Sequence, residues 1–320
     1  MNRRFLGRAM SAAAVMALTL AACGGQSDSS SGGSGSSGVS GEVLVDGSST
    51  VQPLTAAAGE LFKEEQQDVN VSVGTAGTGG GFEVFCKGTT DISDASRPIE
   101  DDEAAACKKS GIDYTELHVA TDALTVVVSK DNDFITCLTT DQLKTLWEPQ
   151  AEGKITTWDQ VDPSFPAEPI ELFGAGTDSG TFDYFTDAIN GEEGASRTDY
   201  NATEDDNVTV QGVSGSSNAL GYFGFSYYEE NQDALKAVEI DSGNGCVAPS
   251  PDSAQDGTYT PLSRPLFIYV SNQAAADKPQ VKAFVDFYAA NDSDIVDAAG
   301  FIPLNDEQYA ELKTTAESLT

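Results

Sequence analysis

A repeated order of strand-like run, small-residue loop and helix-periodic run constrains the fold of this chain more than any other feature. The clearest copy is residues 174–182, where glycine, serine and threonine separate the apolar run 169–173 from helical spacing over 182–189. Loops of the same kind occupy residues 47–51 and 77–81, each after a strand-like run. This repetition predicts an α/β fold with a mainly parallel sheet.

The same loops predict a site for an anion. A helix start presents unpaired backbone N–H groups and the positive end of the helix dipole, and serine and threonine add hydroxyl donors. In open α/β sheets, ligands bind at the carboxyl ends of strands, where these loops fall. A fourth small-residue segment, 93–97, ends in Arg97, which we expect to contact the anion. We expect Arg197 to face water and Arg264 to have a structural role at a junction between lobes.

The N-terminus has the pattern of an exported lipoprotein. Three arginines precede an apolar run over residues 10–22, and the run ends in a lipobox before Cys23. This pattern predicts a signal peptide over 1–22 and lipidation of Cys23. The run is shorter than the ~20 residues of a membrane span. Cys23 and the Gly/Ser tether over 23–41 are therefore expected to anchor a domain to the outer face of the bacterial cell membrane.

The charge balance excludes one large class of partner. The chain has 51 acidic and 17 basic residues, and its formal net charge is −34. Such a surface repels nucleic acids and anionic lipids, so we expect no nucleic-acid partner. It also repels anionic ligands at long range. An anion site in this chain must therefore hold its ligand by short-range hydrogen bonds.

Four cysteines follow Cys23, and an even number in an exported chain favours two disulfides. The sequence alone allows three connectivities. Of these, we expect Cys86 to pair with Cys107, because both lie near the ends of short predicted helices that flank one strand, and Cys137 to pair with Cys246. The spacing lacks the CxxC pattern of a zinc site. We therefore expect no metal.

Motifs for catalysis and for cofactors are missing from the sequence. The glycine loop 77–81 is not a GxGxxG fingerprint, and no GxxxxGK[ST] motif occurs. The single histidine, His118, lies in a strand-like run rather than beside a nucleophile. We expect no cofactor and no enzyme activity. An exported phosphohydrolase is the alternative from the enzyme class, and a structural or adhesive protein is a third reading.

Two strong β runs divide the chain. They cover residues 124–129 and 265–270, and a second α/β region lies between them. If both runs cross between lobes, one lobe comprises residues 42–125 plus 268–320 and the other residues 126–267. The chain is long enough for two such lobes.

Five segments, in chain order, resemble the PstS-type phosphate-binding proteins of ABC importers: residues 46–54, 77–82, 91–99, 176–182 and 218–223. They span the whole domain after the tether. The resemblance implies the type II periplasmic-binding-protein fold, in which two α/β lobes are joined by two crossover strands and close over the ligand. It implies inorganic phosphate as the ligand, the permease and ATPase subunits of an ABC importer as partners, and a monomer.

The motifs also imply the residues that contact phosphate. The implied contacts are Ser49, Thr50 and the Val51 amide from the first loop, Thr78 and the Gly79 amide from the second, Ser96 and Arg97 from the third, and Ser179, Gly180 and Thr181 from the fourth.

Two positions depart from the best-known members of that family. The arginine that precedes their Ser-Gly-Thr motif is Ala175 here, and the aspartate that accepts a proton from phosphate is replaced by Arg97. We expect Arg97 to supply the missing positive charge from the opposite lobe. Asp94 and Asp178 are candidates for the missing acceptor. Sulfate or molybdate is therefore the alternative ligand.

Overall fold

The computed structural model describes residues 38–177 and 179–319. The predicted signal peptide over 1–22, the lipidation site Cys23 and most of the tether over 23–41 lie outside the described residues. The lipid anchor therefore stays a prediction. In the part of the chain that the structure describes, no helix is long and apolar enough to cross a membrane.

The strands of the described residues are β1 (Gly41–Gly47), β2 (Val69–Val73), β3 (Ile92–Ala95), β4 (Tyr114–Ser129), β5 (Cys137–Thr139), β6 (Glu171–Ala175), β7 (Asn201–Thr203), β8 (Ala219–Gly224), β9 (Leu235–Ala237), β10 (Glu239–Asp241), β11 (Cys246–Val247) and β12 (Ser263–Ser271). The large sheet has the order β2-β1-β3-β12-β4-β8-β6-β7, with β9 beside β4. Both β1 and β6 have only parallel neighbours, whereas β12 and β4 pair antiparallel. A small second sheet has the order β11-β10-β5.

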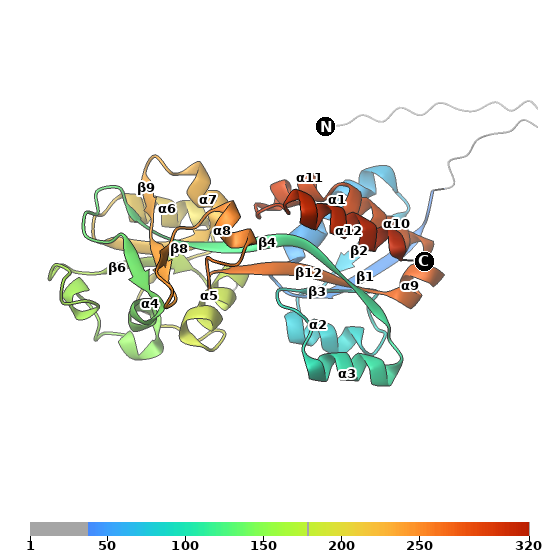
Figure 1. The fold of residues 1–320 in the computed structure, drawn as a ribbon, viewed down its shortest axis with the longest axis horizontal. Helices are drawn as coiled ribbons and strands as arrows, with labels where there is room; N and C mark the ends of the chain where they lie inside the picture. Colours follow the sequence, from blue (N-terminus) through green and yellow to red (C-terminus); the bar gives the residue numbers. More distant parts are fainter. Residues whose placement is uncertain (1–37, 178, 320) are drawn as a thin grey trace, which may run out of the picture. The chain divides into compact units, whose positions relative to one another are not determined.

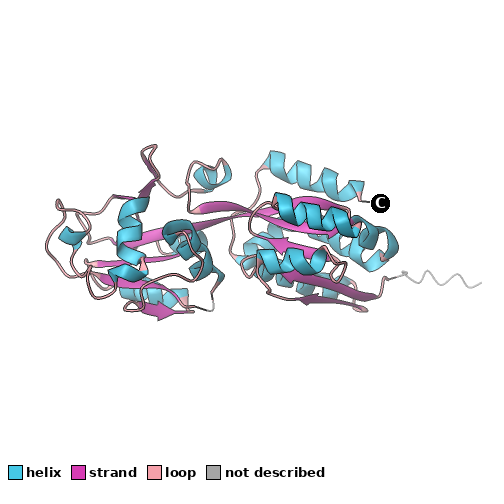
Figure 2. Cartoon of the chain, turned by 90° about the horizontal axis from the view of Figure 1, so that it is seen from below, coloured by secondary structure: helices cyan, strands magenta, loops and turns pink. Residues whose placement is uncertain are grey.

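The helices are α1 (Gln52–Glu65), α2 (Thr78–Phe85), α3 (Asp101–Ser110), α4 (Thr140–Trp147), α5 (Gly180–Asn190), α6 (Asp206–Ser214), α7 (Phe225–Glu230), α8 (Pro251–Gln255), α9 (Asn272–Asp277), α10 (Pro279–Ala290), α11 (Asp292–Ala299) and α12 (Asp306–Ser318). Short 3-10 helices cover Pro149–Ala151 and Trp158–Gln160. Helices lie on both faces of the strands (Figure 2). This layering confirms the predicted α/β class.

The strand β4 contributes to two hydrophobic cores, and β12 pairs with it (Figure 1). In β4, Leu117 and Val119 pack in the first core, whereas Leu124 and Val126 pack in the second. Buried and exposed side chains do not alternate along this strand, because nearly all of its side chains after Leu117 are buried. The crossing strand supports the predicted two-lobe arrangement. The lobe boundaries themselves stay a prediction.

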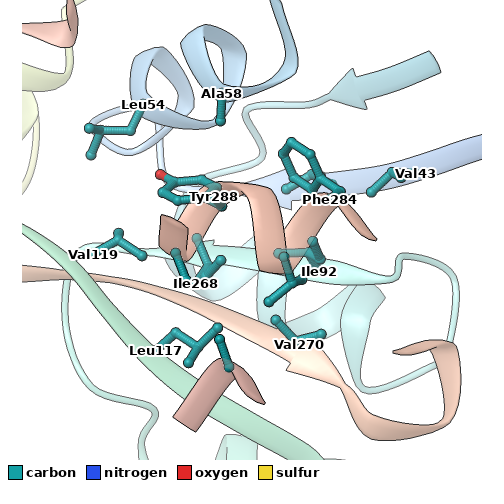
Figure 3. Close-up of a cluster of buried hydrophobic side chains, with 14 of the residues drawn as sticks. Val43, Leu54, Ala58, Ile92, Leu117, Val119, Ile268, Val270, Phe284 and Tyr288 are labelled. Atoms are coloured by element: carbon teal, nitrogen blue, oxygen red, sulfur yellow. The ribbon is translucent and has the colours of Figure 1, made fainter. Parts of the chain in front are cut away.

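The first core joins elements from both ends of the sequence (Figure 3). Val43 of β1, Leu54 of α1 and Ile92 of β3 pack with Ile268 of β12 and Phe284 of α10. Each of these side chains is at most 1% exposed. Burial of one such side chain contributes about 1.5–3 kcal/mol, so the packing of α10 on the sheet stabilises the strands that carry the site loops.

Both predicted disulfides are present. Cys86, just after α2, bonds to Cys107 of α3, and Cys137 of β5 bonds to Cys246 of β11. The second disulfide joins the two outer strands of the small sheet. Cross-links of this kind stabilise a fold mainly by restricting the unfolded chain.

The prediction that Arg197 faces water is wrong. Its side chain is 4% exposed and donates to the carbonyl oxygens of Leu146 at 3.0 Å and Ile155 at 3.1 Å. It also pairs with Asp199, and that hydrogen bond lowers the pKa of Asp199 to about 2. A buried guanidinium needs such partners, so Arg197 is a structural residue.

Candidate anion-binding site

Two cavities meet where the loop between β1 and α1 approaches the start of α5. The larger has a volume of about 950 Å³ and the smaller about 510 Å³. Ser49, Thr50 and Gly180 line both cavities, and Ser179 and Thr181 line the smaller one. The structure therefore brings together two of the loops that the sequence predicts, although Gly180 follows Thr50 by 130 positions in the chain.

Glycine at position 180 allows the close approach of these loops. A Cβ atom there would lie 3.0 Å from Thr50 Oγ1 and 3.1 Å from both Ser49 Oγ and the Thr50 amide nitrogen. Ser179 caps α5, because its Oγ accepts a hydrogen bond from the Thr181 amide at 3.1 Å. The start of α5 therefore faces the β1–α1 loop with its remaining N–H groups near the cavity.

The β1–α1 loop is held against β3 by its backbone. The Ser48 amide donates to the Asp94 carbonyl oxygen at 2.9 Å, and the Thr50 amide donates to Ser48 Oγ at 3.2 Å. Gly47 has a φ of +145°, and a Cβ there would overlap the Asp94 carbonyl oxygen. Val51, a predicted contact, lines neither cavity, and its side chain is buried in the first core. Only its backbone amide is left for a ligand.

The second and third predicted loops form another wall of the larger cavity. Thr78 and Gly79 at the start of α2 line it, as do Ser96 and Arg97 after β3. Thr78 Oγ1 lies 3.1 Å from Ser96 Oγ and accepts a hydrogen bond from the Ser96 amide at 3.2 Å. This pairing fixes both hydroxyl groups at the cavity wall.

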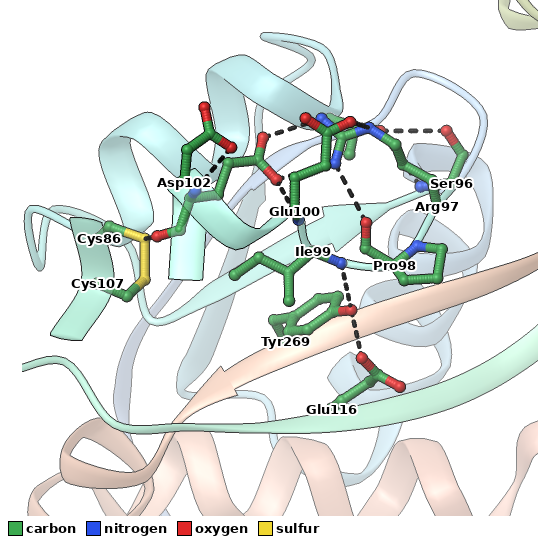
Figure 4. Close-up of polar contacts among 12 residues, drawn as sticks. Cys86, Ser96, Arg97, Pro98, Ile99, Glu100, Asp102, Cys107, Glu116 and Tyr269 are labelled. Atoms are coloured by element: carbon green, nitrogen blue, oxygen red, sulfur yellow. Dashed lines mark hydrogen bonds and ion pairs between the residues drawn. A yellow bond between two sulfur atoms is a disulfide. The ribbon is translucent and has the colours of Figure 1, made fainter. Parts of the chain in front are cut away.

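Arg97 reaches the cavity wall with its charge already compensated (Figure 4). Its guanidinium forms two hydrogen bonds with Glu103, at 2.8 and 2.9 Å, and lies 3.4 Å from Glu100. Burial would raise the pKa of Glu103, but hydrogen bonds from Arg97 and the Glu100 amide outweigh it and lower that pKa. The side chain of Arg97 is 36% exposed. An anion would have to share this arginine with two carboxylates.

Arg264 is the site residue that the sequence analysis missed. It lies in β12 opposite Asp122 of β4, and its Nε is 3.3 Å from Asp122 Oδ2. Its Nη2 donates to Thr50 Oγ1 at 2.7 Å, and its guanidinium carbon lies 3.5 Å from the ring centre of Tyr184. Arg264 also lines the larger cavity. It therefore adds a cation beside the contact between Thr50 and Gly180.

One sequence signal could have found Arg264. It stands just before the strong β run 265–270, which was expected to cross between lobes. A crossing strand passes the cleft between lobes, so a polar residue near its start can reach the ligand as well as the junction.

Asp94, a candidate proton acceptor, lines neither cavity. It is fully buried, and its Oδ1 accepts a hydrogen bond from Thr55 Oγ1 at 2.9 Å. Its Oδ2 has no hydrogen-bond partner among the described residues. Burial raises the pKa of Asp94 to about 8, although the Thr55 hydrogen bond opposes this. The other candidate, Asp178, lies outside the described residues.

Asp94→Asn is expected to stabilise the protein increasingly as pH rises from about 4 to about 8. The folded state of the native chain keeps a proton on Asp94 over this range, whereas the unfolded chain loses it near 3.8, so the stability contributed by Asp94 falls with rising pH. Asparagine removes this dependence. The difference in unfolding free energy between variant and native chain should grow by about 1.4 kcal/mol per pH unit in denaturant titrations. A difference that does not change with pH would show that Asp94 is ionised in the folded protein.

The fold and the cavities define an α/β binding protein with a polar site beside its crossing strands. A family model described as a PBP superfamily domain matches residues 32–292, and the chain belongs to that superfamily. Its relatives include protein SphX of Synechocystis, which is 49% identical over 267 residues and covers 83% of this chain and 80% of that protein. The phosphate-binding protein PstS of Staphylococcus saprophyticus is 40% identical over 304 residues, covering 94% and 91%.

A solved structure agrees with these relatives. The crystal structure of a possible phosphate binding protein from Planctomyces limnophilus has a TM-score of 0.83 and 43% sequence identity, and the match covers 88% of this chain and 99% of that one. The chain is thus a member of the family that contains the SphX and PstS proteins. The predicted family resemblance and the type II periplasmic-binding-protein fold are confirmed.

Proposed function

We propose that this chain binds inorganic phosphate outside the cytoplasm and hands it to the permease of an ABC importer. The observation that carries the proposal is the convergence of three helix starts, those of α1, α2 and α5, with Arg264 at the same pair of cavities. Helix N-termini, hydroxyl groups and a guanidinium are the donors that a desolvated phosphate requires. The relatives named PstS support the choice of phosphate.

The proposed contacts extend the predicted set by one residue. The hydroxyls of Ser49, Thr50, Thr78 and Ser96 and the start of α5 donate hydrogen bonds to phosphate oxygens. Arg264 supplies the positive charge beside Thr50, and Arg97 adds a second cation from the other wall. The proposed set is Ser49, Thr50, Val51, Thr78, Gly79, Ser96, Arg97, Ser179, Gly180, Thr181 and Arg264.

The proposed function requires only that the protein binds and releases phosphate, without covalent chemistry. Residues 42–125 plus 268–320 and residues 126–267 act as two lobes that close on the ligand, with a hinge in the crossing strands. Lipidated Cys23 and the tether over 23–41 hold a monomer at the outer face of the cell membrane. The family names of the relatives support a binding protein over an exported phosphohydrolase.

Calorimetric titration of the purified domain with phosphate, sulfate and molybdate tests the proposal. We expect phosphate to bind with micromolar or tighter affinity and the other two anions to bind at least about 100-fold more weakly. Equal affinities for phosphate and sulfate would remove the phosphate assignment. Release of phosphate from monoesters by the pure protein would favour a hydrolase instead.

A further inference from the structure

Tyr184 joins two segments that meet at the proposed phosphate site. It lies in α5, about one turn after the donors at the start of that helix, and it is 7% exposed. The face of its ring lies against Arg264 of β12, with the guanidinium carbon 3.5 Å from the ring centre. Both residues line the larger cavity. The helix that carries neutral donors therefore also contacts the cation of the site.

The hydroxyl of Tyr184 makes a second link to the chain just before Arg264. Burial raises the pKa of Tyr184 above its usual range, so the hydroxyl stays protonated. It donates a hydrogen bond to the Pro261 carbonyl oxygen at 2.7 Å. Pro261 lines the same cavity and precedes Arg264 by three positions. One side chain of α5 thus holds both ends of this short segment.

The other contacts of Arg264 reach only the edge of its guanidinium group. Its Nε lies 3.3 Å from Asp122 Oδ2, and its Nη2 donates to Thr50 Oγ1 at 2.7 Å. Each of these is a contact through one nitrogen. The ring of Tyr184 instead covers the face of the group, so it restrains the tilt of the guanidinium plane, which edge contacts restrain less.

Arg97 shows a different way of holding an arginine at this cavity. Glu103 binds it through two hydrogen bonds, at 2.8 and 2.9 Å, and Glu100 lies 3.4 Å away. These carboxylates orient the guanidinium, but they also compensate its charge. An aromatic ring orients a guanidinium without adding a formal negative charge. Arg264, which has one carboxylate partner and a ring, therefore keeps more of its attraction for an anion than Arg97 does.

We propose that Tyr184 is a positioning residue of the phosphate site: its ring holds the guanidinium of Arg264 toward Thr50 and the start of α5. This inference rests on the proposed function, because it presupposes that phosphate occupies the cavity. The contact makes the donors of α5 and the cation of β12 move together. A phosphate ion then meets the helix start and the arginine as one preorganised set of donors.

The test compares Tyr184→Leu, which removes the ring, with Tyr184→Phe, which keeps it. Phosphate affinity is measured by calorimetry on the purified protein. We expect Tyr184→Leu to bind phosphate about 10-fold more weakly than the native chain, because the guanidinium plane is no longer held. Tyr184→Phe should stay within about threefold of the native affinity, because it loses only the hydrogen bond to Pro261.

Phe185→Leu is the matched control for loss of an aromatic ring from α5. Phe185 is the next residue of that helix, is fully buried in the same core as Tyr184 and lines neither cavity. This variant should lower the thermal unfolding midpoint but keep phosphate affinity within about threefold of native. An equal loss of affinity in Phe185→Leu would show that the packing of α5, and not the contact with Arg264, sets the affinity.

A spectroscopic measurement reports on Arg264 independently of affinity. Three arginines follow the predicted signal peptide, namely Arg97, Arg197 and Arg264, so isotope labelling of arginine nitrogen gives a simple spectrum. Protons above the face of an aromatic ring resonate upfield. The Nε–H proton of Arg264 should therefore resonate upfield in the native chain and in Tyr184→Phe. Tyr184→Leu should lose this shift, while the resonance of buried Arg197 stays unchanged.

A double variant separates positioning from support of the fold. Once Arg264→Gln has removed the arginine, Tyr184→Leu should change phosphate affinity less than about threefold, measured by equilibrium dialysis with labelled phosphate. Tyr184→Met, which fills more of the space, replaces Tyr184→Leu if that variant does not fold. A full 10-fold loss without Arg264, or native affinity in a folded variant without the ring, would overturn the role of Tyr184 and leave the proposed function standing. Absence of phosphate binding by the native protein would overturn the proposed function itself, and the inference with it.

Discussion

Arg264→Gln is expected to lower phosphate affinity about 1000-fold. Arg264 lines the larger cavity and donates to Thr50, so its guanidinium can share one phosphate with that hydroxyl. Removing a partly buried, charge-assisted donor costs roughly 3–4 kcal/mol of binding free energy. Calorimetry or equilibrium dialysis with labelled phosphate measures the loss. A smaller loss is expected for Arg97→Gln, about 10-fold, because Glu103 already neutralises that side chain.

A control separates ligand contact from folding. Removal of Arg264 leaves Asp122, which is 5% exposed, without its cation, and burial already raises the pKa of that carboxyl. The double variant Arg264→Gln/Asp122→Asn removes this uncompensated charge. It should recover thermal stability and still bind phosphate weakly. If affinity returns with stability, or if Arg97→Gln proves the more damaging change, Arg264 is a structural residue, as the sequence first suggested.

Gly180→Val is expected to lower phosphate affinity at least about 100-fold while the protein stays folded. The new side chain would collide with Ser49 and with the backbone of Thr50, so the start of α5 and the β1–α1 loop would move apart. Donors that must converge on one small anion would then be displaced, and misplacement by about 1 Å is costly. Affinity is measured by calorimetry, and folding by the thermal unfolding midpoint.

Gly224→Ala serves as the matched control for that variant. Gly224 lines the smaller cavity, and a Cβ there meets no atom within 4 Å. The Gly224→Ala variant should bind phosphate with the affinity of the native chain. Native affinity in Gly180→Val would show that phosphate binds without the close contact of α5 and the loop.

Local patterns predicted most of the secondary structure. The strand predicted over 69–73 is β2, and the helix predicted from the spacing over 182–189 is the central part of α5. The strand β4 is continuous from Tyr114 to Ser129, whereas the sequence predicted a strong β run over 124–129 and a separate strand-like run around His118. The part of β4 before residue 124 carries Glu116 and Asp122, which interrupt the apolar run. Their side chains are satisfied by partners on β12, and pairing between distant strands is not visible in a local pattern.

Because a local pattern does not show contacts between distant residues, only some of the site residues could be predicted. Ser49, Thr78 and Gly180 were predicted because each lies in a small-residue loop at a helix start, a feature of a few consecutive residues. The role of Arg264 depends on the register of β12 with β4 and on the approach of the β1–α1 loop to the start of α5. It could not be read from neighbouring residues, and Arg197 was misjudged for the same reason, since its carbonyl partners lie 42 and 51 positions away.

The first core also sets the order in which the protein can mature. Its early members, such as Val43 and Leu54, pack against Ile268, Phe284 and Leu312, which follow them by more than 200 positions in the chain. A growing chain therefore carries this apolar surface uncovered through most of its synthesis. The core, and with it the β1–α1 loop that packs against it, can therefore be completed only after α10 and α12 have been synthesised.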